Sequence, residues 1–363
     1  MGSAILAHCA QRGASVIGFD KFARGHALGS SSGKSRMIRK AYFEDPAYVP
    51  LLLRSYELWR ALERDTGADI LRITGLLMVG NERTEIIAGA RRAAHEHGLP
   101  LETLTLTQIG VRYPTLRVMG GEIGIYEPDG GVLAPERAIE AHLLAASAAG
   151  AQIAFELGME SWTPTKEGFM VQLTDGTRVS ARSLVLSLGA WIQKMFQAIG
   201  VAIRVQRNVQ AWFAPATQAY DAARFPPFLL DRVGLPAPLY GFPDFGDGIK
   251  AAFHSHGDLT DAEHVDRAVN PARDIQPIAD AMEQWMPGAT AKSLAAKPCL
   301  YTLTPDGHFV IDRHPEHPQL ILCGGFSGHG FKFAPVIGEI VADLALAGGS
   351  RHRIDFLSLR RFG

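Results

Sequence analysis

The sequence has few cysteines, almost no net charge and no long apolar run. Its 363 residues include three widely spaced cysteines and no CxxC pair of the kind that binds zinc, so neither a disulfide framework nor a metal site is predicted. The formal net charge of -1 gives no attraction for nucleic acid or anionic lipid. No apolar run reaches the roughly 18 residues that span a bilayer, and the amino terminus does not resemble a signal peptide. We therefore expect a cytoplasmic protein without nucleic-acid or membrane partners.

The amino terminus also lacks the first half of a dinucleotide-binding unit. Residues 1–12 have the apolar spacing of a helix, and residues 14–20 form a β-rich run that ends in Asp20. A helix followed by a strand that ends in an acid is the second half of a βαβ unit, in which the acid binds ribose hydroxyls. Of the G-x-G-x-x-G glycines only Gly2 is present, at the third position. We expect an amino-terminally truncated copy with an unpaired sheet edge. The alternative for Asp20 is a surface residue that opens a turn.

Periodicity along the rest of the chain predicts both helices and strands. Apolar stripes indicate helices at 46–65, 83–97, 135–149 and 335–346. Short apolar runs indicate strands at 73–80, 151–156, 183–188 and 319–323, and a hairpin at 169–173 and 178–181. Residues 120–133 are rich in turn residues, and residues 201–255 resemble an antiparallel sheet. Nucleotide-type units thus lie at both ends of the chain, with β-rich sequence between them.

Two basic segments suggest contacts with an anion or a ring. Arg36 and Arg39 follow a run of small residues and would share one face of a helical turn, which suits a carboxylate or phosphate. Lys250 and His254 are four apart, so an alternating strand would place both on one face. A lysine held there can favour the negative charge that develops when oxygen is reduced. The alternatives are a solvated basic face and an ordinary edge strand.

The strongest motif is the glycine-rich loop at 324–333, GGFSGHGFKF, which lies between a predicted strand and a predicted helix. Such a loop directs backbone N–H groups at an anion or an electron-rich ring, and Lys332 enters at the start of the helix. Cys299 follows a proline and precedes a tyrosine, at a predicted change from strand to loop, where a thiolate can form a thioether with a flavin methyl group. Cys323 lies inside a predicted strand and fits a small buried residue.

These motifs together resemble monomeric sarcosine oxidase and N-methyltryptophan oxidase, a family of FAD-dependent amine oxidases. The resemblance rests on the glycine-rich loop, on Cys299 with the Leu-Tyr-Thr that follows it, and on the 33 residues between Cys299 and Lys332. It extends from Gly2 to Phe362 through Asp312-Arg-His-Pro, residues 35–42, Tyr48-Val-Pro-Leu, Tyr240-Gly-Phe-Pro and Leu188-Gly-Ala-Trp.

The resemblance implies an α/β (α+β two-domain) fold, in which a Rossmann-like FAD-binding domain is interleaved with a mostly antiparallel-sheet substrate domain. The FAD-binding segments would be 1–65, 132–200 and 290–363, and the substrate segments 66–131 and 201–289. It also implies a monomer that oxidises the N-methyl group of a secondary amino acid with O2, giving an amino acid, formaldehyde and hydrogen peroxide.

The site residues follow from the same resemblance, position by position. Cys299 would carry the flavin as 8α-S-cysteinyl FAD, Arg39 and Lys332 would bind the substrate carboxylate, and Lys250 would activate oxygen. Arg36 would lie close to the flavin, and Tyr240, His254 and Tyr301 would line the substrate pocket. The other expected cofactor contacts are Gly2, Asp20, Ser31, Ser32, Met159, Gly189, Trp191, Gly325, Ser327, Gly328, His329 and Gly330.

The sequence departs from the family pattern beside the expected flavin. Ser32 and Lys34 stand where family members commonly carry a histidine and an acidic residue, so one charge is reversed there. The broken glycine fingerprint keeps a second hypothesis open, that of a catalytically impaired or inert flavoprotein. A third hypothesis, an NAD-dependent dehydrogenase, is disfavoured by Cys299 and the glycine-rich loop. N-methyltryptophan or another secondary amino acid remains an alternative substrate.

Overall fold

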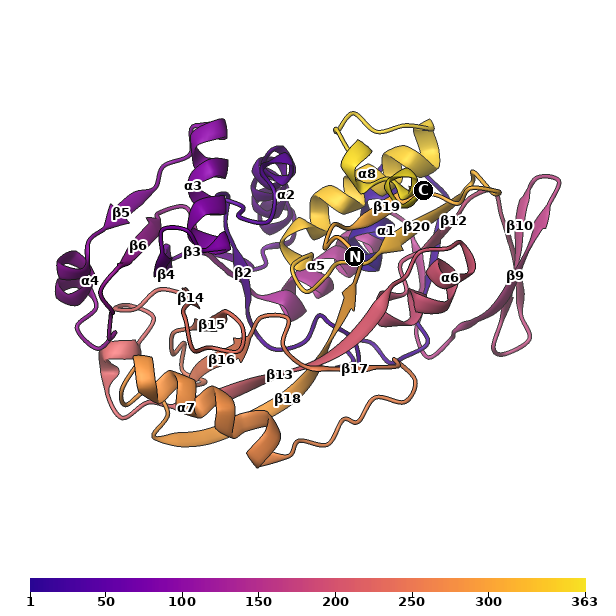
Figure 1. The fold of residues 1–363 in the computed structure, drawn as a ribbon. Coiled ribbons are helices and arrows are strands. Elements are labelled where there is room, and N and C mark those ends of the chain that lie inside the picture. Colours follow the sequence, from indigo (N-terminus) through magenta and orange to yellow (C-terminus); the bar gives the residue numbers. More distant parts are fainter.

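A computed structural model describes residues 1–363, and its elements form two groups (Figure 1). The α-helices are α1 (Gly2–Gln11), α2 (Val49–Thr66), α3 (Glu85–His97), α4 (Leu106–Arg112), α5 (Pro135–Ala148), α6 (Gln193–Ala198), α7 (Gln276–Trp285) and α8 (Ala334–Ala347). None of them combines the length and the apolar character needed to cross a membrane.

The first group resembles a Rossmann layer and joins the two ends of the chain. It contains two sets of strands: β1 (Ile17–Phe19) pairs in parallel with β8 (Gln152–Ala154), and β12 (Leu184–Leu186) pairs in parallel with β20 (Leu320–Gly324), which also pairs with β19 (Val310–Arg313). Helix α1 packs against α8 and α5. Gly338 permits the close approach of α8, since a Cβ there would lie 2.8 Å from the carbonyl oxygen of Ala4.

Strands β1 and β12 of this layer each pair along one edge only. β1 has β8 as its strand partner and β12 has β20, so each strand leaves one edge without a ladder. The open edge changes the burial expected for residues 183–188. Leu184 and Val185 are half-buried, and Leu186 is buried, so the prediction of a strand covered on both faces is wrong. A neighbour on only one side leaves part of the strand accessible to solvent.

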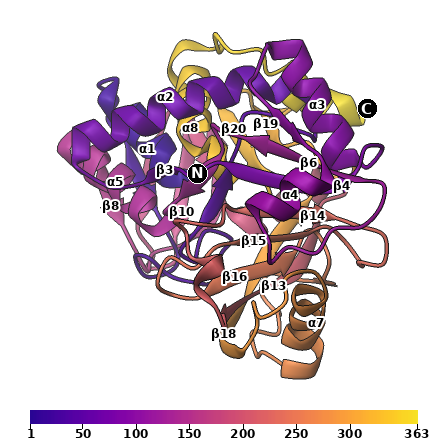
Figure 2. The ribbon, with the colours of Figure 1, turned by 90° about the vertical axis from the view of Figure 1, so that its left-hand side faces the viewer.

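The second group is built on a mostly antiparallel sheet of nine strands. In sheet order these are β17 (Asp258–Thr260), β13 (Arg204–Ala214), β16 (Ile249–Phe253), β15 (Leu239–Phe242), β14 (Phe228–Asp231), β4 (Leu76–Asn81), β6 (Glu122–Glu127) and β5 (Glu102–Leu104), with β18 (Lys292–Leu303) paired to β13. Its largest core cluster includes Phe213, Phe228 and Met282. Figures 1 and 2 show β13 and β18 as a long ribbon that runs from the side of α7 toward the first group.

Two small sheets complete the fold. β2 (Arg36–Ile38), β7 (Gly131–Leu133) and β3 (Leu71–Ile73) form one, and β9 (Met159–Thr165), β10 (Gly168–Leu173) and β11 (Arg178–Ala181) form the other. The turn-rich stretch 120–133 therefore contains strands β6 and β7, which the sequence reading missed. The strand predicted at 73–80 is two strands, β3 and β4, separated at Gly75, which has a φ of +73°.

The predicted division into domains stays a prediction. Residues 290–363 were assigned to the FAD-binding segments, and β18 lies within them. In the structure β18 pairs with β13 along most of its length and so extends the large sheet. The ribbon of β13 and β18 thus links the two groups of elements, and the candidate site lies along it.

Candidate flavin and substrate site

Cys299 lies on a buried face of the ribbon, in the middle of β18. The expected change from strand to loop at this residue is wrong, because β18 continues to Leu303. Cys299 is opposite Asn208, and Tyr301 is opposite Gln206. Directly opposed residues of an antiparallel pair share a face, so the thiol and Tyr301 point to the same side as these two amides. The Cys299 Sγ lies 3.7 Å from the carbonyl oxygen of Ser30.

The glycine-rich loop packs directly against this face. Gly325 and Gly328 have φ values of +65° and +83°, and Ser327 also has a positive φ. A Cβ at Gly328 would lie 2.2 Å from the ring of Tyr301, so only glycine fits there. The Ser327 N–H donates to the carbonyl oxygen of Thr302 at 2.8 Å. The cysteine strand and the loop that leads to Lys332 are therefore in contact, as the sequence predicted.

Two buried basic residues, Arg39 and Lys332, lie beside the ring of Tyr42, at 4.7 and 5.2 Å from its centroid. Each is about 4% exposed. Lys332 Nζ donates to the carbonyl oxygen of His329 at 2.7 Å, and burial lowers the pKa of this lysine well below its usual value. Arg39 pairs with Glu44 through its Nη2. Burial opposes the charge of Glu44, but Arg39 lowers the pKa of this carboxyl to about 2. A substrate carboxylate at Arg39 must therefore displace Glu44 or share the guanidinium with it.

The two arginines do not share a helical turn, so that expectation is wrong. Residues 36–38 form strand β2, in which side chains three apart point to opposite faces. The Arg36 guanidinium folds back on its own loop and donates to the carbonyl oxygens of Ser30, Ser32 and Ser35. Arg36 therefore stabilises the small-residue segment and does not bind an anion together with Arg39.

Lys250 is buried on β16 beneath the same segment. Its Nζ donates to the carbonyl oxygens of Gly33 and Ser35 at 2.9 and 2.8 Å, and lies 4.8 Å from the ring centroid of Phe242. Burial, followed by the charge of Arg36, lowers the pKa of Lys250 well below its usual value. The residue expected to act on oxygen is thus a desolvated amine whose charge is easily lost.

Tyr240, His254 and Tyr301 form an aromatic group between the ribbon and β15. The ring centroid of His254 lies 6.4 Å from that of Tyr240 and 5.9 Å from that of Tyr301. His254 lies one residue beyond the end of β16. Burial lowers the pKa of His254 to about 4, so this histidine is neutral at physiological pH. The group offers an apolar wall with hydroxyl groups beside the two cations.

His329 is a buried residue of the glycine-rich loop. Its Nδ1 bonds the hydroxyl of Tyr42, and its Nε2 lies 3.1 Å from the carbonyl oxygen of Gly307. Burial lowers the pKa of His329 to about 3. The ring is therefore neutral and fixed by partners at both nitrogens, which holds the loop in place on the side away from Cys299.

The remaining predicted cofactor residues lie in the Rossmann-like layer and in the loops beside it. Gly2 opens α1, whose first turn has no side-chain cap. Asp20 follows β1 and accepts the N–H of Phe22 at 2.9 Å, as a residue that opens a turn does. The ring of Trp191 lies against that of Phe22 in a tilted arrangement. Ser31 and Ser32 lie in the loop before β2, Met159 begins β9, and Gly189 follows β12 with a φ of +56°.

The residues present fit a flavin on the cysteine face of the ribbon. Asn208 and Gln210 are buried, and their side-chain oxygens Oδ1 and Oε1 have no hydrogen-bond partner. Gln210 lies opposite Lys297 and so on the same face as Cys299. Buried acceptors are nearly always satisfied in folded proteins, and an isoalloxazine ring carries a donor for such groups. The uncapped start of α1 suits a phosphate.

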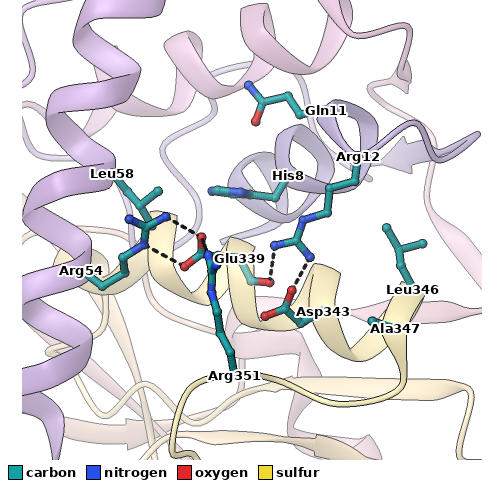
Figure 3. A pocket seen from close by; sticks show the side chains of 10 residues that line it. All are labelled: His8, Gln11, Arg12, Arg54, Leu58, Glu339, Asp343, Leu346, Ala347 and Arg351. Carbon is teal, nitrogen blue, oxygen red and sulfur yellow. Dashed lines mark hydrogen bonds and ion pairs between the residues drawn. The ribbon is translucent and has the colours of Figure 1, made fainter.

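A separate surface pocket of about 620 Å³ lies away from these residues (Figure 3). At its floor Glu339 accepts hydrogen bonds from Arg54 and Arg351, and its neighbour Asp343 pairs with Arg12. Burial opposes the charge of Glu339, but the bond from Arg54 contributes to lowering its pKa to about 2. The charged groups of this pocket are paired with one another, and the pairs connect α1, α2 and α8. We therefore interpret the pocket as a feature of the packing of these helices.

Comparison with known proteins assigns the chain to a family. The family described as FAD dependent oxidoreductase matches residues 1–344. The chain belongs to the FAD-dependent oxidoreductases. It is 42% identical to monomeric sarcosine oxidase of Streptomyces avermitilis, over 99% of this chain and 95% of that protein. It is 31% identical to N-methyl-L-tryptophan oxidase of Yersinia pestis, over 100% of this chain and 96% of that protein. These matches give no support to the expectation of a truncated copy.

Solved structures agree with the fold of this FAD-dependent oxidoreductase. The open form of NikD, an unusual amino acid oxidase essential for nikkomycin biosynthesis, superimposes with a TM-score of 0.86 at 23% identity, over 98% of this chain and 94% of that one. Glycine oxidase from Geobacillus kaustophilus gives 0.80 at 21% identity, over 99% and 95%. The predicted class, a Rossmann-like part combined with a mostly antiparallel sheet, is confirmed.

Besides Gln210, three residues of the site were not predicted from the sequence. Glu44 pairs with Arg39, Asn208 faces Cys299, and Glu127 accepts backbone N–H groups just after Arg39. Glu44 follows Arg39 by only five residues, so an acid near a predicted carboxylate-binding arginine was the available signal. The other two come from strands distant in sequence, and no local pattern marks them.

Proposed function

We propose that this flavoenzyme oxidises the N-methyl group of a small secondary amino acid such as sarcosine. One observation carries the proposal: the buried residues Arg39 and Lys332 both lie beside the ring of Tyr42, and the glycine-rich loop that leads to Lys332 contacts Tyr301 on the strand of Cys299. A buried carboxylate requires such cationic partners. The names and the identities of the relatives support the same substrate class. We also propose a cytoplasmic monomer with the domain division given above.

In this proposal each residue has a defined task. Arg39 and Lys332 bind the substrate carboxylate, while Tyr240, His254 and Tyr301 enclose the amine and its methyl group. The carboxylate of this site, Glu44, is paired with Arg39, so we assign the amine no carboxylate base and expect it to react in its neutral form. FAD, when bound, accepts a hydride equivalent. One secondary amine, one O2 and one water then give the primary amine, formaldehyde and hydrogen peroxide.

The proposal is tested with FAD-loaded protein and a panel of N-methyl amino acids. Peroxide and formaldehyde are expected in equal amounts from sarcosine or from a related N-methyl amino acid such as N-methyltryptophan. Protein that binds FAD but releases neither product from any member of the panel is an inert flavoprotein, and the proposal then fails. Reduction of a nicotinamide cofactor in place of oxygen would instead favour a dehydrogenase.

We further propose that FAD is attached covalently through the Cys299 thiol: the C–S bond would replace the S–H bond and one C–H bond of the flavin methyl group, and the two electrons and two protons would pass to O2, giving hydrogen peroxide. The thiol is buried on the face that carries the two unpartnered amide oxygens. We expect wild-type protein to stay yellow after acid precipitation and Cys299→Ser to lose all its colour, since only a thioether survives unfolding. Cys323→Ser is the matched control, because this second buried thiol lies inside β20. Colour retained by precipitated Cys299→Ser would exclude this attachment site.

A further inference from the structure

A buried carboxyl group, Glu127, lies directly behind the residue expected to bind substrate. It ends strand β6 and is 1% exposed. Its side chain accepts the backbone N–H of Lys40 and, at 3.3 Å, that of Ala41. These are the two residues that follow Arg39. Glu127 therefore fixes the backbone that carries the Arg39 guanidinium, and it acts on Arg39 without touching the substrate site itself.

No cationic side chain donates to Glu127. Lys40 Nζ pairs instead with Asp129 at 2.7 Å, and the Tyr56 hydroxyl donates to the Asp129 carbonyl oxygen. Arg39, the other charged neighbour, is paired with Glu44. Burial raises the pKa of Glu127 to about 7, although the N–H groups of Lys40 and Ala41 and the charge of Arg39 oppose this. The carboxyl group thus titrates in the neutral range.

Binding of a substrate carboxylate at Arg39 would change the net charge of the buried site. Arg39 and Glu44 compensate each other in the structure. A substrate carboxylate adds a negative charge, and Lys332 is the remaining cation that can balance it. Burial lowers the pKa of Lys332, so its charged form is disfavoured. If Glu127 stayed ionised, three carboxylates would surround at most two cations in a dry site. Uncompensated buried charge is costly, and a group that can neutralise does so.

We propose that Glu127 takes up a proton when a carboxylate binds at Arg39, so that substrate affinity depends on the protonation of this buried residue. The inference rests on the proposed function in placing a carboxylate at Arg39. By linkage, affinity for an anion should then fall as pH rises above neutrality, by about tenfold between pH 6 and pH 8. Replacement by glutamine mimics the protonated state and should remove this dependence.

The experiment measures acetate binding to the FAD-loaded protein by calorimetry at pH 6, 7 and 8, in pairs of buffers with different ionisation enthalpies. Acetate stays ionised throughout this range. We expect uptake close to one proton at pH 8 in the wild type and close to zero in Glu127→Gln. Glu127→Gln should bind acetate at pH 8 about as tightly as the wild type does at pH 6. Since no turnover is involved, the result is independent of which amine is oxidised.

Glu122→Gln is the matched control. Glu122 begins the same strand, is buried, and accepts the N–H of Met119, but it pairs with Arg232 rather than with the site. It should keep the wild-type proton uptake. Absence of acetate binding, absence of uptake in the wild type, or equal uptake in Glu127→Gln would each overturn the inference, the last by assigning the proton to Lys332.

A second measurement covers the case in which Glu127→Gln does not fold. In the wild type, the infrared difference spectrum on adding acetate should gain the band of a protonated carboxyl group, whereas proton uptake by Lys332 would add no such band. A spectrum without that band overturns the inference. If acetate binds with proton uptake but no N-methyl amino acid is oxidised, only the proposed function fails. If sarcosine is oxidised and uptake is absent, only the role of Glu127 fails.

Discussion

Replacing Lys250 with methionine is expected to slow the reaction of the loaded enzyme with oxygen by about 10²–10³-fold, the usual effect of removing one preorganised electrostatic group. Oxygen gains negative charge as it is reduced, and Lys250 is a buried amine on β16 whose Nζ donates to the small-residue segment at Gly33. Methionine has similar volume but no charge. The measurement is oxygen consumption per bound flavin. The rate is divided by bound flavin because the carbonyls of Gly33 and Ser35 lose their donor, which lowers the stability of the fold.

The same residue predicts how the oxygen reaction depends on pH. Because burial lowers the pKa of Lys250, the charged form is lost at a lower pH than for an exposed lysine. The rate with oxygen should therefore fall as pH rises through that value, and Lys250→Met should show no such fall. Lys292→Met is the control, since Lys292 begins β18 and is exposed. A change of less than about threefold in Lys250→Met would remove this residue from the oxygen reaction.

Local signals predicted the helices well and the sheets less well. The apolar stripe predicted a helix at 83–97, and α3 spans Glu85–His97 and ends at Gly98, with a φ of +63°. Such a glycine stop is encoded within a few residues. Strand β6 was missed because the glycines and the proline around it suggest turns, while its partner β4 lies more than 40 residues earlier. A strand that is defined by a distant partner leaves little trace in its own sequence.

The chemistry of the site was predictable by residue type but not by partner. The motifs placed Cys299, Arg39 and Lys332 in one site, and the structure brings the cysteine strand and the glycine-rich loop together through Tyr301 and Gly328. The hydrogen-bond and ion-pair partners of these residues were not predictable, because they depend on the local backbone conformation. Arg36 and Arg39 were expected to converge on a helical turn, whereas strand β2 separates them and leaves Arg39 to Glu44.

Replacing Arg39 with methionine is expected to raise the KM for a carboxylate substrate by about 10²–10³-fold, because truncating one partner of a buried charge pair commonly costs about 2–5 kcal/mol. The substitution has a second effect. Glu44, whose side chain is only 16% exposed, would remain without its cation, which destabilises the fold by up to about 3–5 kcal/mol. Loss of activity in this variant alone would therefore not separate binding from folding. Steady-state kinetics and thermal unfolding must be measured on the same preparation.

The double variant Arg39→Met/Glu44→Gln separates the two effects. Removing both charges leaves no uncompensated carboxylate, so the melting temperature should return most of the way to the wild-type value. The KM for sarcosine should remain high, because the guanidinium that binds its carboxylate is still absent. Dimethylamine, which has no carboxylate, should be oxidised as slowly by the wild type as by the double variant. Recovery of the wild-type KM together with stability would show that Arg39 serves the fold and that Lys332 alone binds the substrate carboxylate.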